Sequence, residues 1–149
     1  MRVGIFDPYL DTLGGGERYM FTAASCLSKD HQVFLFWDDP TILAKAQERF
    51  ALHLSGVKLN KNIFSSKVSL PSRLIETKRY DCIIYLSDGS LPLTLAKKLI
   101  VHFQFPVEWV KIDALTKLKL ARISRVICNS HFTKRFIDQK FHIASTVLY

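Results

Sequence analysis

The sequence predicts an α/β fold: a single domain built on a doubly wound, mainly parallel sheet. Three observations favour it. The chain has 149 residues, enough to bury one substantial core. Its composition, 48% hydrophobic and 12% aromatic, excludes a disordered segment. Short apolar runs alternate from end to end with amphipathic stretches, which is the pattern of strands joined by crossover helices.

Seven short runs are predicted strands. Most of them are nearly continuous apolar stretches, which is typical of parallel strands covered on both faces. They are residues 3–6, 33–37, 57–59, 82–86, 99–103, 125–128 and 146–148. No internal repeat and no low-complexity linker interrupts them, so one domain is expected over residues 1–149.

Five segments between the strands are predicted helices. The first, at 17–28, places its apolar residues on one face. Thr41 is expected to cap a helix over 41–50, and Ser130 to cap one that ends at Phe141. Shorter helices are predicted at 70–76 and 114–122. This alternation with the strands is typical of a Rossmann-like sheet with helices on both faces.

The first loop is the most informative segment. A predicted strand leads through Asp7 to Gly14, Gly15 and Gly16, which open the first helix. Glycines let a ligand approach the backbone, and the free N–H groups and macrodipole of a helix start favour an anion such as a phosphate. The spacing is neither G-x-G-x-x-G nor a P-loop. The residues alone leave two interpretations open, a phosphate site or a turn that only leads the chain into its helix.

Three segments, in order, carry a family resemblance. The first runs from Gly4 through the three glycines to Tyr19, the second is the strand at 99–106 with His102, and the third is the strand-to-helix junction at 126–134. Together they resemble the group 1 family of retaining, nucleotide-sugar-dependent glycosyltransferases with the GT-B architecture. The segment at 41–79 carries no motif of that family.

The resemblance implies the amino-terminal, acceptor-side half of such an enzyme. A sugar would move from a nucleotide diphosphate donor to a hydroxyl acceptor with retention of configuration, and the diphosphate would lie near Gly14, Gly15 and Gly16. In the family a second Rossmann-like domain holds most of the donor contacts, so this chain by itself is expected to be inactive. The nucleotide-sugar is a substrate, and no cofactor is expected. The alternative is a non-catalytic Rossmann-like binding or scaffold domain.

Polar residues after the predicted strands are the candidate site. His102 ends a strand at the carboxyl edge, where open α/β sheets bind ligands. The resemblance implies that it orients the sugar or stabilises charge, and a hydrogen-bonded core histidine is the competing interpretation. Asp88, Gln104 and Glu108 are candidates for binding the acceptor, although Asp88 is also explained by an Asp-Gly turn.

Cysteine usage and hydropathy indicate a cytoplasmic protein. Cys26, Cys82 and Cys128 lie in apolar patterns without C-x-x-C spacing, so buried, reduced thiols are expected. Asp7 and Asp11 flank the first loop but are too few ligands for a metal, and no metal site is predicted. No apolar run reaches the roughly 18 residues of a membrane span, and no signal peptide is recognised.

Positive charge is concentrated near the carboxyl end of the chain. The net charge is +8, and residues 111–140 contain eight Lys and Arg against two Asp. Lys117, Lys119 and Arg122 are expected to attract an anionic membrane surface, on its cytosolic face, where a lipid-linked acceptor would lie. The competing interpretation is a solvated surface that only provides solubility. No recognisable motif indicates nucleic-acid binding, so nucleic acid is not an expected partner.

Overall fold

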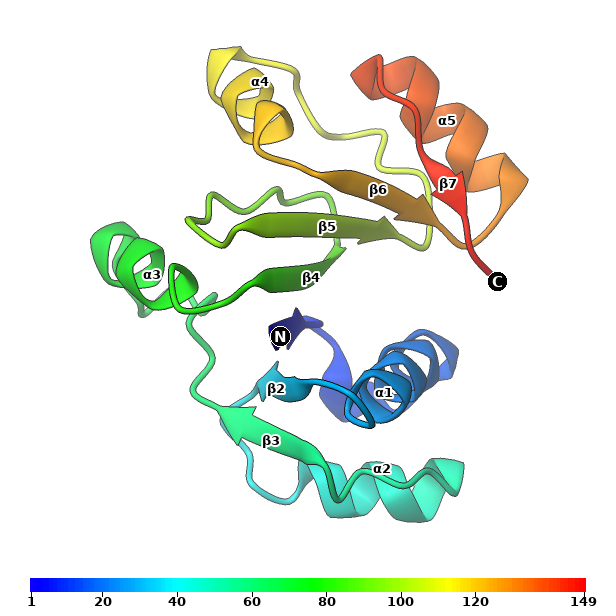
Figure 1. Cartoon of the computed structure of the whole chain (residues 1–149). Helices are drawn as coiled ribbons and strands as arrows, with labels where there is room; N and C mark the ends of the chain where they lie inside the picture. The colour runs from blue at the N-terminus through cyan, green and yellow to red at the C-terminus, as the bar shows by residue number, and fades with distance from the viewer.

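Seven strands form one sheet in the order β3-β2-β1-β4-β5-β6-β7, and every neighbouring pair is parallel (Figure 1). The computed structural model describes all of residues 1–149. The strands are β1 Arg2–Phe6, β2 Gln32–Phe36, β3 Val57–Asn60, β4 Cys82–Ser87, β5 Lys98–Phe103, β6 Arg125–Cys128 and β7 Thr146–Val147. Each coincides with a predicted strand, so the doubly wound α/β fold is confirmed.

The helices also lie close to their predicted positions. They are α1 Gly15–Leu27, α2 Ile42–Phe50, α3 Leu70–Thr77, α4 Ala114–Ala121 and α5 His131–Phe141, with a 3-10 turn at Leu10–Thr12. None has the length and apolar content needed to cross a membrane. Ser130 caps α5 as predicted, because its hydroxyl accepts a hydrogen bond from the Thr133 N–H at 3.1 Å. Thr41 occupies the N-cap position of α2 as predicted, but its hydroxyl donates to the Asp39 carboxylate at 2.7 Å and makes no capping hydrogen bond.

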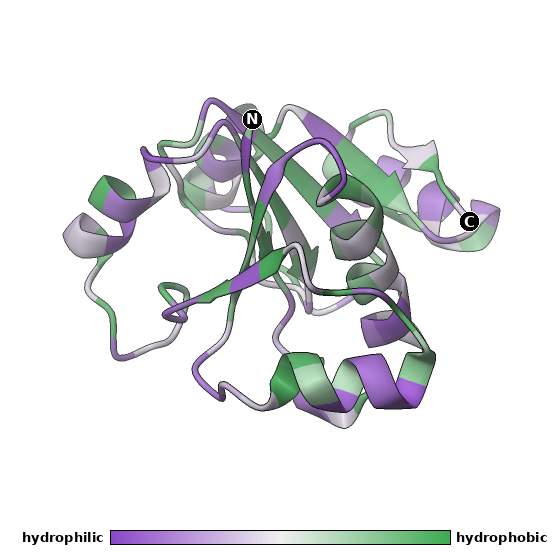
Figure 2. Cartoon of the chain, turned by 60° about the horizontal axis from the view of Figure 1, so that its bottom comes forward, coloured by the Kyte–Doolittle hydropathy of each residue, from purple (hydrophilic) through white to green (hydrophobic).

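The helices cover the sheet from two sides. Helices α1 and α2 pack on the face to which Val3 and Ile5 of β1 point, which we call the α1 face. Helix α5 packs on the opposite face through Ile137 and Phe141, and we call this the α5 face. Figure 2 shows the hydrophobic strands enclosed between helices whose outer turns are hydrophilic. The chain winds along the α1 face as far as β3, then returns to the centre at β4 and winds along the α5 face.

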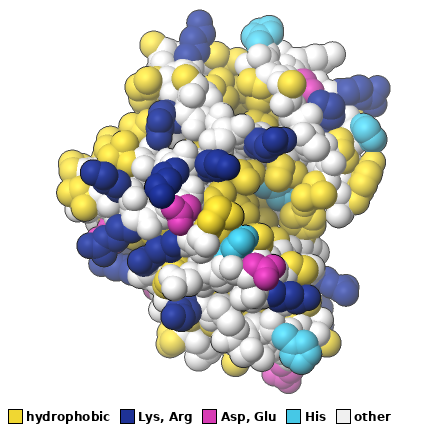
Figure 3. All heavy atoms as spheres, viewed as in Figure 1, with side chains coloured by type: hydrophobic (Ala, Val, Ile, Leu, Met, Phe, Trp, Pro, Cys, Tyr) yellow, Lys and Arg dark blue, Asp and Glu magenta, His cyan; other side chains and the backbone are white.

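The two faces of β4, β5 and β6 are covered unequally. On the α5 face, Ile83, Val101 and Cys128 are fully buried. On the α1 face, Ile84 and Ile100 of the two central strands are only half-buried, because no helix after α2 packs there. A hollow of about 410 Å³ remains, lined by residues that include both isoleucines. Figure 3 shows hydrophobic side chains gathered in a hollow on one side of the molecule, with Lys and Arg side chains around it.

The thiols do not all follow the sequence prediction. Cys82 and Cys128 are buried, as expected for inert core thiols, and all three cysteines are free. Cys26 is exposed, so the prediction of a buried thiol is wrong there. It lies near the end of α1 on the side away from the buried Met20 and Ala24. The apolar pattern around Cys26 identified the helix but not the face that it presents to solvent.

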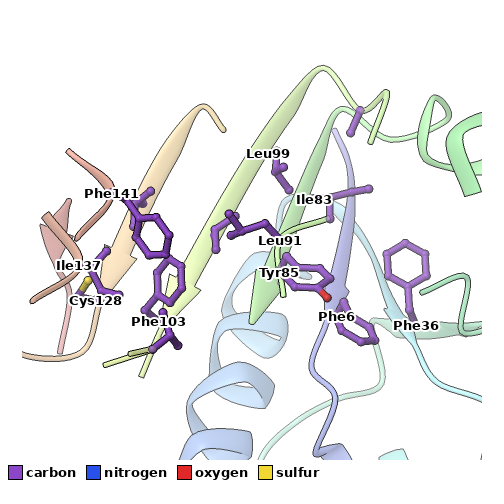
Figure 4. Packing of buried hydrophobic residues seen from close by; sticks show 14 of the residues in the cluster. Phe6, Phe36, Ile83, Tyr85, Leu91, Leu99, Phe103, Cys128, Ile137 and Phe141 are labelled. Carbon is purple, nitrogen blue, oxygen red and sulfur yellow. The ribbon is translucent and has the colours of Figure 1, made fainter. Parts of the chain in front are cut away.

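The core on the α5 face is largely aromatic. Phe103 and Phe141 stack with ring centroids 5.8 Å apart, and Phe6 and Tyr85 stack at 4.7 Å (Figure 4). Towards β2, the Phe36 ring lies directly over Gly4 of β1. A Cβ atom added at Gly4 would come within 2.6 Å of that ring. Glycine is required at this position because a neighbouring strand's aromatic ring occupies the space of its side chain.

We therefore expect Gly4→Ala to lower the free energy of unfolding by about 1–3 kcal/mol, the usual cost of overpacking a closed core. The matched control is Gly15→Ala at the start of α1, where an added Cβ meets nothing within 4 Å. That control should leave the stability unchanged or raise it slightly, because alanine favours helix. Urea denaturation of both variants checks the prediction, and a Gly4→Ala protein as stable as wild type would contradict it.

Candidate functional site

The candidate site lies at the carboxyl edge of the sheet, where β1 and β4 are neighbours but the chain leaves them towards opposite faces. In open α/β sheets, this point is where ligands bind. His102 of β5 pairs in register with Leu86 of β4, and Asp7 follows Phe6, which pairs with Tyr85. Asp7, Leu86 and His102 therefore occupy one row across three strands. The amino-terminal end of α1 follows closely along the chain and covers this row.

His102 is buried without a hydrogen bond. It is 1% exposed, and neither Nδ1 nor Nε2 has a partner. The Tyr19 ring of α1 packs against the imidazole with a centroid distance of 4.7 Å. Burial lowers the pKa of His102 to about 4, so the ring is neutral at physiological pH. The alternative of a hydrogen-bonded core histidine is not what the structure shows, and buried polar atoms without partners are uncommon enough to require a reason.

Asp7 is a second buried group with an unpartnered atom. Its Oδ1 accepts a hydrogen bond from the Tyr9 N–H at 2.8 Å, whereas Oδ2 has no partner. The pKa of Asp7 is raised to about 7, mainly by burial and to a smaller extent by the nearby charges of Glu17 and Asp11, while the hydrogen bond from the Tyr9 N–H lowers it. The sequence pattern indicates Asp7 only as a possible metal ligand. No three His, Cys, Asp or Glu side chains are grouped closely enough to hold a metal ion.

The three glycines differ in what surrounds them. The Gly14 N–H donates to Glu17 Oε2 at 2.6 Å, and a side chain at Gly14 would meet the same carboxylate. The Gly16 carbonyl accepts from Gln104 Nε2 at 3.3 Å, and a side chain at Gly16 would meet that amide. Only Gly15 faces open space. Folding contacts therefore account for Gly14 and Gly16, and the backbone is open to a ligand at Gly15.

A pocket of about 440 Å³ runs along α1 from the open glycine. Its lining residues come from α1 and from the chain after β7: Gly15, Arg18, Tyr19, Thr22, Ala23, Cys26, Leu148 and Tyr149. The volume lies in the range of small-molecule sites. Arg18 provides a cation beside Gly15, and no sequence pattern indicated this role for it. Tyr19 separates this pocket from His102 and is held by one long hydrogen bond, from its hydroxyl to the Leu148 carbonyl at 3.5 Å.

The three candidates for the acceptor site have different surroundings. Asp88 Oδ1 accepts from the Ser90 N–H at 3.0 Å and from its hydroxyl at 2.7 Å, and Gly89 has a φ of +108°. This is the Asp-Gly turn that was the alternative for Asp88. Gln104 joins the β5 end to α1, within reach of the glycine turn. Glu108 is exposed, and only its backbone carbonyl is bonded, to Lys140.

Comparison with known protein families, curated proteins and solved structures gave no match for this chain. Its Rossmann-like fold does not indicate one function, because such domains carry many unrelated chemistries. The geometry of the carboxyl edge is therefore the basis for inferring a function. Its main features are two buried groups with unpartnered atoms, an open helix start and an adjoining pocket.

The two buried groups should change stability with pH in opposite directions. Asp7 has a higher pKa in the folded than in the unfolded state, so it lowers stability as pH rises from about 4 to about 7. His102 has a lower pKa in the folded state, so it raises stability as pH rises from about 4 to 6.5. As pH rises through these windows, the free energy of unfolding of Asp7→Asn should increase relative to wild type by on the order of 3 kcal/mol. That of His102→Gln should decrease relative to wild type by a similar amount.

Urea denaturation between pH 4.5 and pH 7.5 measures both differences. Because only changes with pH are compared, any constant effect of each substitution cancels. Asp39→Asn is the control, since hydrogen bonds from Thr41 and Lys45 hold the pKa of that carboxyl at about 2, and it should leave the slope over this pH range nearly unchanged. Parallel curves for wild type and Asp7→Asn would show that Asp7 is not a buried acid.

Proposed function

We propose that this chain is the acceptor-side domain of a retaining glycosyltransferase. In the reaction, the bond from the anomeric carbon of the donor sugar to the diphosphate breaks, and the diphosphate leaves with the electron pair. A bond forms to a hydroxyl oxygen of the acceptor, whose proton passes to the departing diphosphate. A second domain would supply most of the contacts with the nucleotide-sugar, as the family resemblance of the sequence implies.

The proposal rests mainly on the burial of His102 without a hydrogen-bond partner. Its two ring nitrogens are buried and unpartnered at the end of β5, where a ligand binds in this type of sheet. A neutral imidazole can donate one hydrogen bond and accept another, which suits a sugar hydroxyl. Its lowered pKa makes it a weak base, so we assign it to orienting the sugar rather than to removing the acceptor proton.

The glycine turn and its pocket support an anionic donor group. Gly15 leaves room for a phosphate at the start of α1, where the helix macrodipole favours negative charge. Arg18 lines the same pocket and would pair with a diphosphate. For the sugar to contact His102, the Tyr19 ring has to rotate away from the imidazole. Only one long hydrogen bond restrains its hydroxyl.

The alternative remains a non-catalytic Rossmann-like binding or scaffold domain, and two contacts favour it. The N–H of Gly14 is already bonded to Glu17, and the space beside Gly16 is filled by Gln104. The Glu17 carboxylate also partly offsets the positive potential of the helix start. In a scaffold domain, these glycines would serve folding only, and no ligand would approach Gly15.

Titration with UDP-glucose and GDP-mannose, followed by backbone amide NMR shifts, separates these two functions. The enzyme proposal predicts saturable shifts at residues 14–19 and 102–104 with at least one donor. The dissociation constant should be millimolar, about −4 kcal/mol, because few contacts come from this domain. Gly15→Val should abolish the shifts, since the branched side chain would occupy the open space, and it should leave the fold intact.

Ala44→Val, at an exposed position of α2, is the matched control and should bind like wild type. Absence of shifts with every donor would support the scaffold function. Micromolar donor affinity would contradict the assignment of the main donor contacts to another domain. Unchanged binding by a folded Gly15→Val protein would contradict the phosphate site at this turn.

A further inference from the structure

Helix α4 and the loop before it expose an unusual amount of apolar surface. The exposed fractions are 63% for Trp109, 38% for Ile112, 53% for Leu115 and 56% for Leu118. Three cations, Lys111, Lys117 and Lys119, are interspersed with them along the chain. We call these seven residues the α4 patch. Figure 3 shows hydrophobic and basic side chains side by side over the position of α4 in Figure 1.

The exposed leucines of α4 form one stripe. Leu115 and Leu118 are three residues apart, so they lie on the same side of the helix. The opposite side, with Leu120, packs against the core of the α5 face, and Ile123 follows it there. No residue of α4 is fully buried. The helix therefore has apolar side chains on both sides: one side packs on the core, and the other is exposed to solvent.

The loop before α4 is tied to the first turn of the helix. The Thr116 hydroxyl donates to the Lys111 carbonyl at 3.1 Å, and the Thr116 N–H donates to Asp113 Oδ1 at 2.7 Å. These bonds place Ile112 beside the start of α4. Further back in the loop, Trp109 packs near the Phe105 ring, with centroids 6.0 Å apart. Ile112 and the outer side of α4 thus lie side by side, and Trp109 precedes them on the same loop.

The cations of the α4 patch are free of ion pairs. All four ion pairs of the structure involve other cations, among them Lys134 with Asp138. Nearby, Lys140 donates to the Glu108 carbonyl and Arg122 donates to the Ala96 carbonyl, so these two serve the fold. The sequence predicted that Arg122 acts together with Lys117 and Lys119. Because Arg122 also donates to the Ala96 carbonyl, it is left out of the α4 patch.

We propose that the α4 patch binds an anionic lipid bilayer, with Trp109, Ile112, Leu115 and Leu118 inserted at the interface. The three unpaired lysines would contact lipid phosphates. Tryptophan and leucine flanked by lysine are typical of surfaces that lie in the headgroup region. A protein partner is disfavoured because lysine is depleted from protein interfaces, whereas an anionic bilayer attracts it. The proposal does not depend on transferase activity.

Trp109 is a built-in reporter for this binding. In a Trp37→Phe background it is the only tryptophan, because the chain has two. Vesicles of phosphatidylcholine with 30% phosphatidylglycerol should shift its emission to shorter wavelength, and brominated lipid should quench it. Vesicles of phosphatidylcholine alone should bind at least tenfold more weakly. Binding to the acidic vesicles should weaken from 0.05 M to 0.5 M salt, because screening shortens the range of the charges.

Two double variants separate the apolar and the charged contributions. Leu115→Ser with Leu118→Ser should weaken vesicle binding tenfold or more, and Lys117→Glu with Lys119→Glu should do the same. The matched controls lie outside the patch. They are Leu70→Ser with Ile75→Ser, at exposed positions of α3, and Lys67→Glu with Lys78→Glu, which change the net charge equally.

Both control pairs should bind vesicles like wild type, and circular dichroism should show that all four double variants are folded. Three outcomes would overturn the proposal. They are no binding of wild type to acidic vesicles at low salt, equal binding to neutral vesicles, and equal losses for patch and control variants. A failure of donor binding by the glycine turn has no bearing on any of these outcomes.

Discussion

The handedness of the crossovers between parallel strands is the constraint on which the rest of the structure depends. Parallel strands in one sheet are joined by right-handed connections. As long as the chain moves outward from β1 to β3, this places α1 and α2 on one face. After β3 the chain returns to the centre and moves the other way, so the same handedness places α5 on the opposite face.

This change of face explains where the candidate site lies. The segments that leave β1 and β4 diverge at the carboxyl edge, and α1 covers the row that contains Asp7 and His102. Both side chains lose their contact with water there, and neither gains a full set of partners. Burial disfavours the charged form of each group, which raises the pKa of the acid and lowers that of the base. One physical cause thus gives a neutral imidazole and a carboxyl group that is about half protonated near pH 7, both near the proposed sugar site.

The same change of face leaves half of the α1 face without a helix. Strands β4, β5 and β6 have a complete core on the α5 face, whereas Ile84 and Ile100 on the other side are only half-buried. The separate pocket along α1 lies between this helix and the residues after β7. Parallel sheets are normally covered on both faces, so this half is the region of the sheet most open to a ligand.

Much of the fold could be predicted from the sequence because strands and helices depend on local patterns. Apolar runs identified all seven strands, and Ser130 identified the start of α5, since its hydroxyl acts only on the next helical turn. At Thr41 the pattern predicted the N-cap position correctly but not the side-chain bond, because the hydroxyl donates to Asp39 instead. His102 could be selected because its place at a strand end can be read from the chain.

What only the tertiary structure decided is how residues far apart in sequence surround one another. The unpartnered nitrogens of His102 and the oxygen of Asp7 are consequences of burial, which no local pattern reports. Gly14 and Gly16 are explained by Glu17 and Gln104, so that only Gly15 remains open. Residue types and their order determine the elements and the ends of the strands. The accessibility and charge of each group depend on which surfaces the crossovers cover, and that depends on contacts across the whole chain.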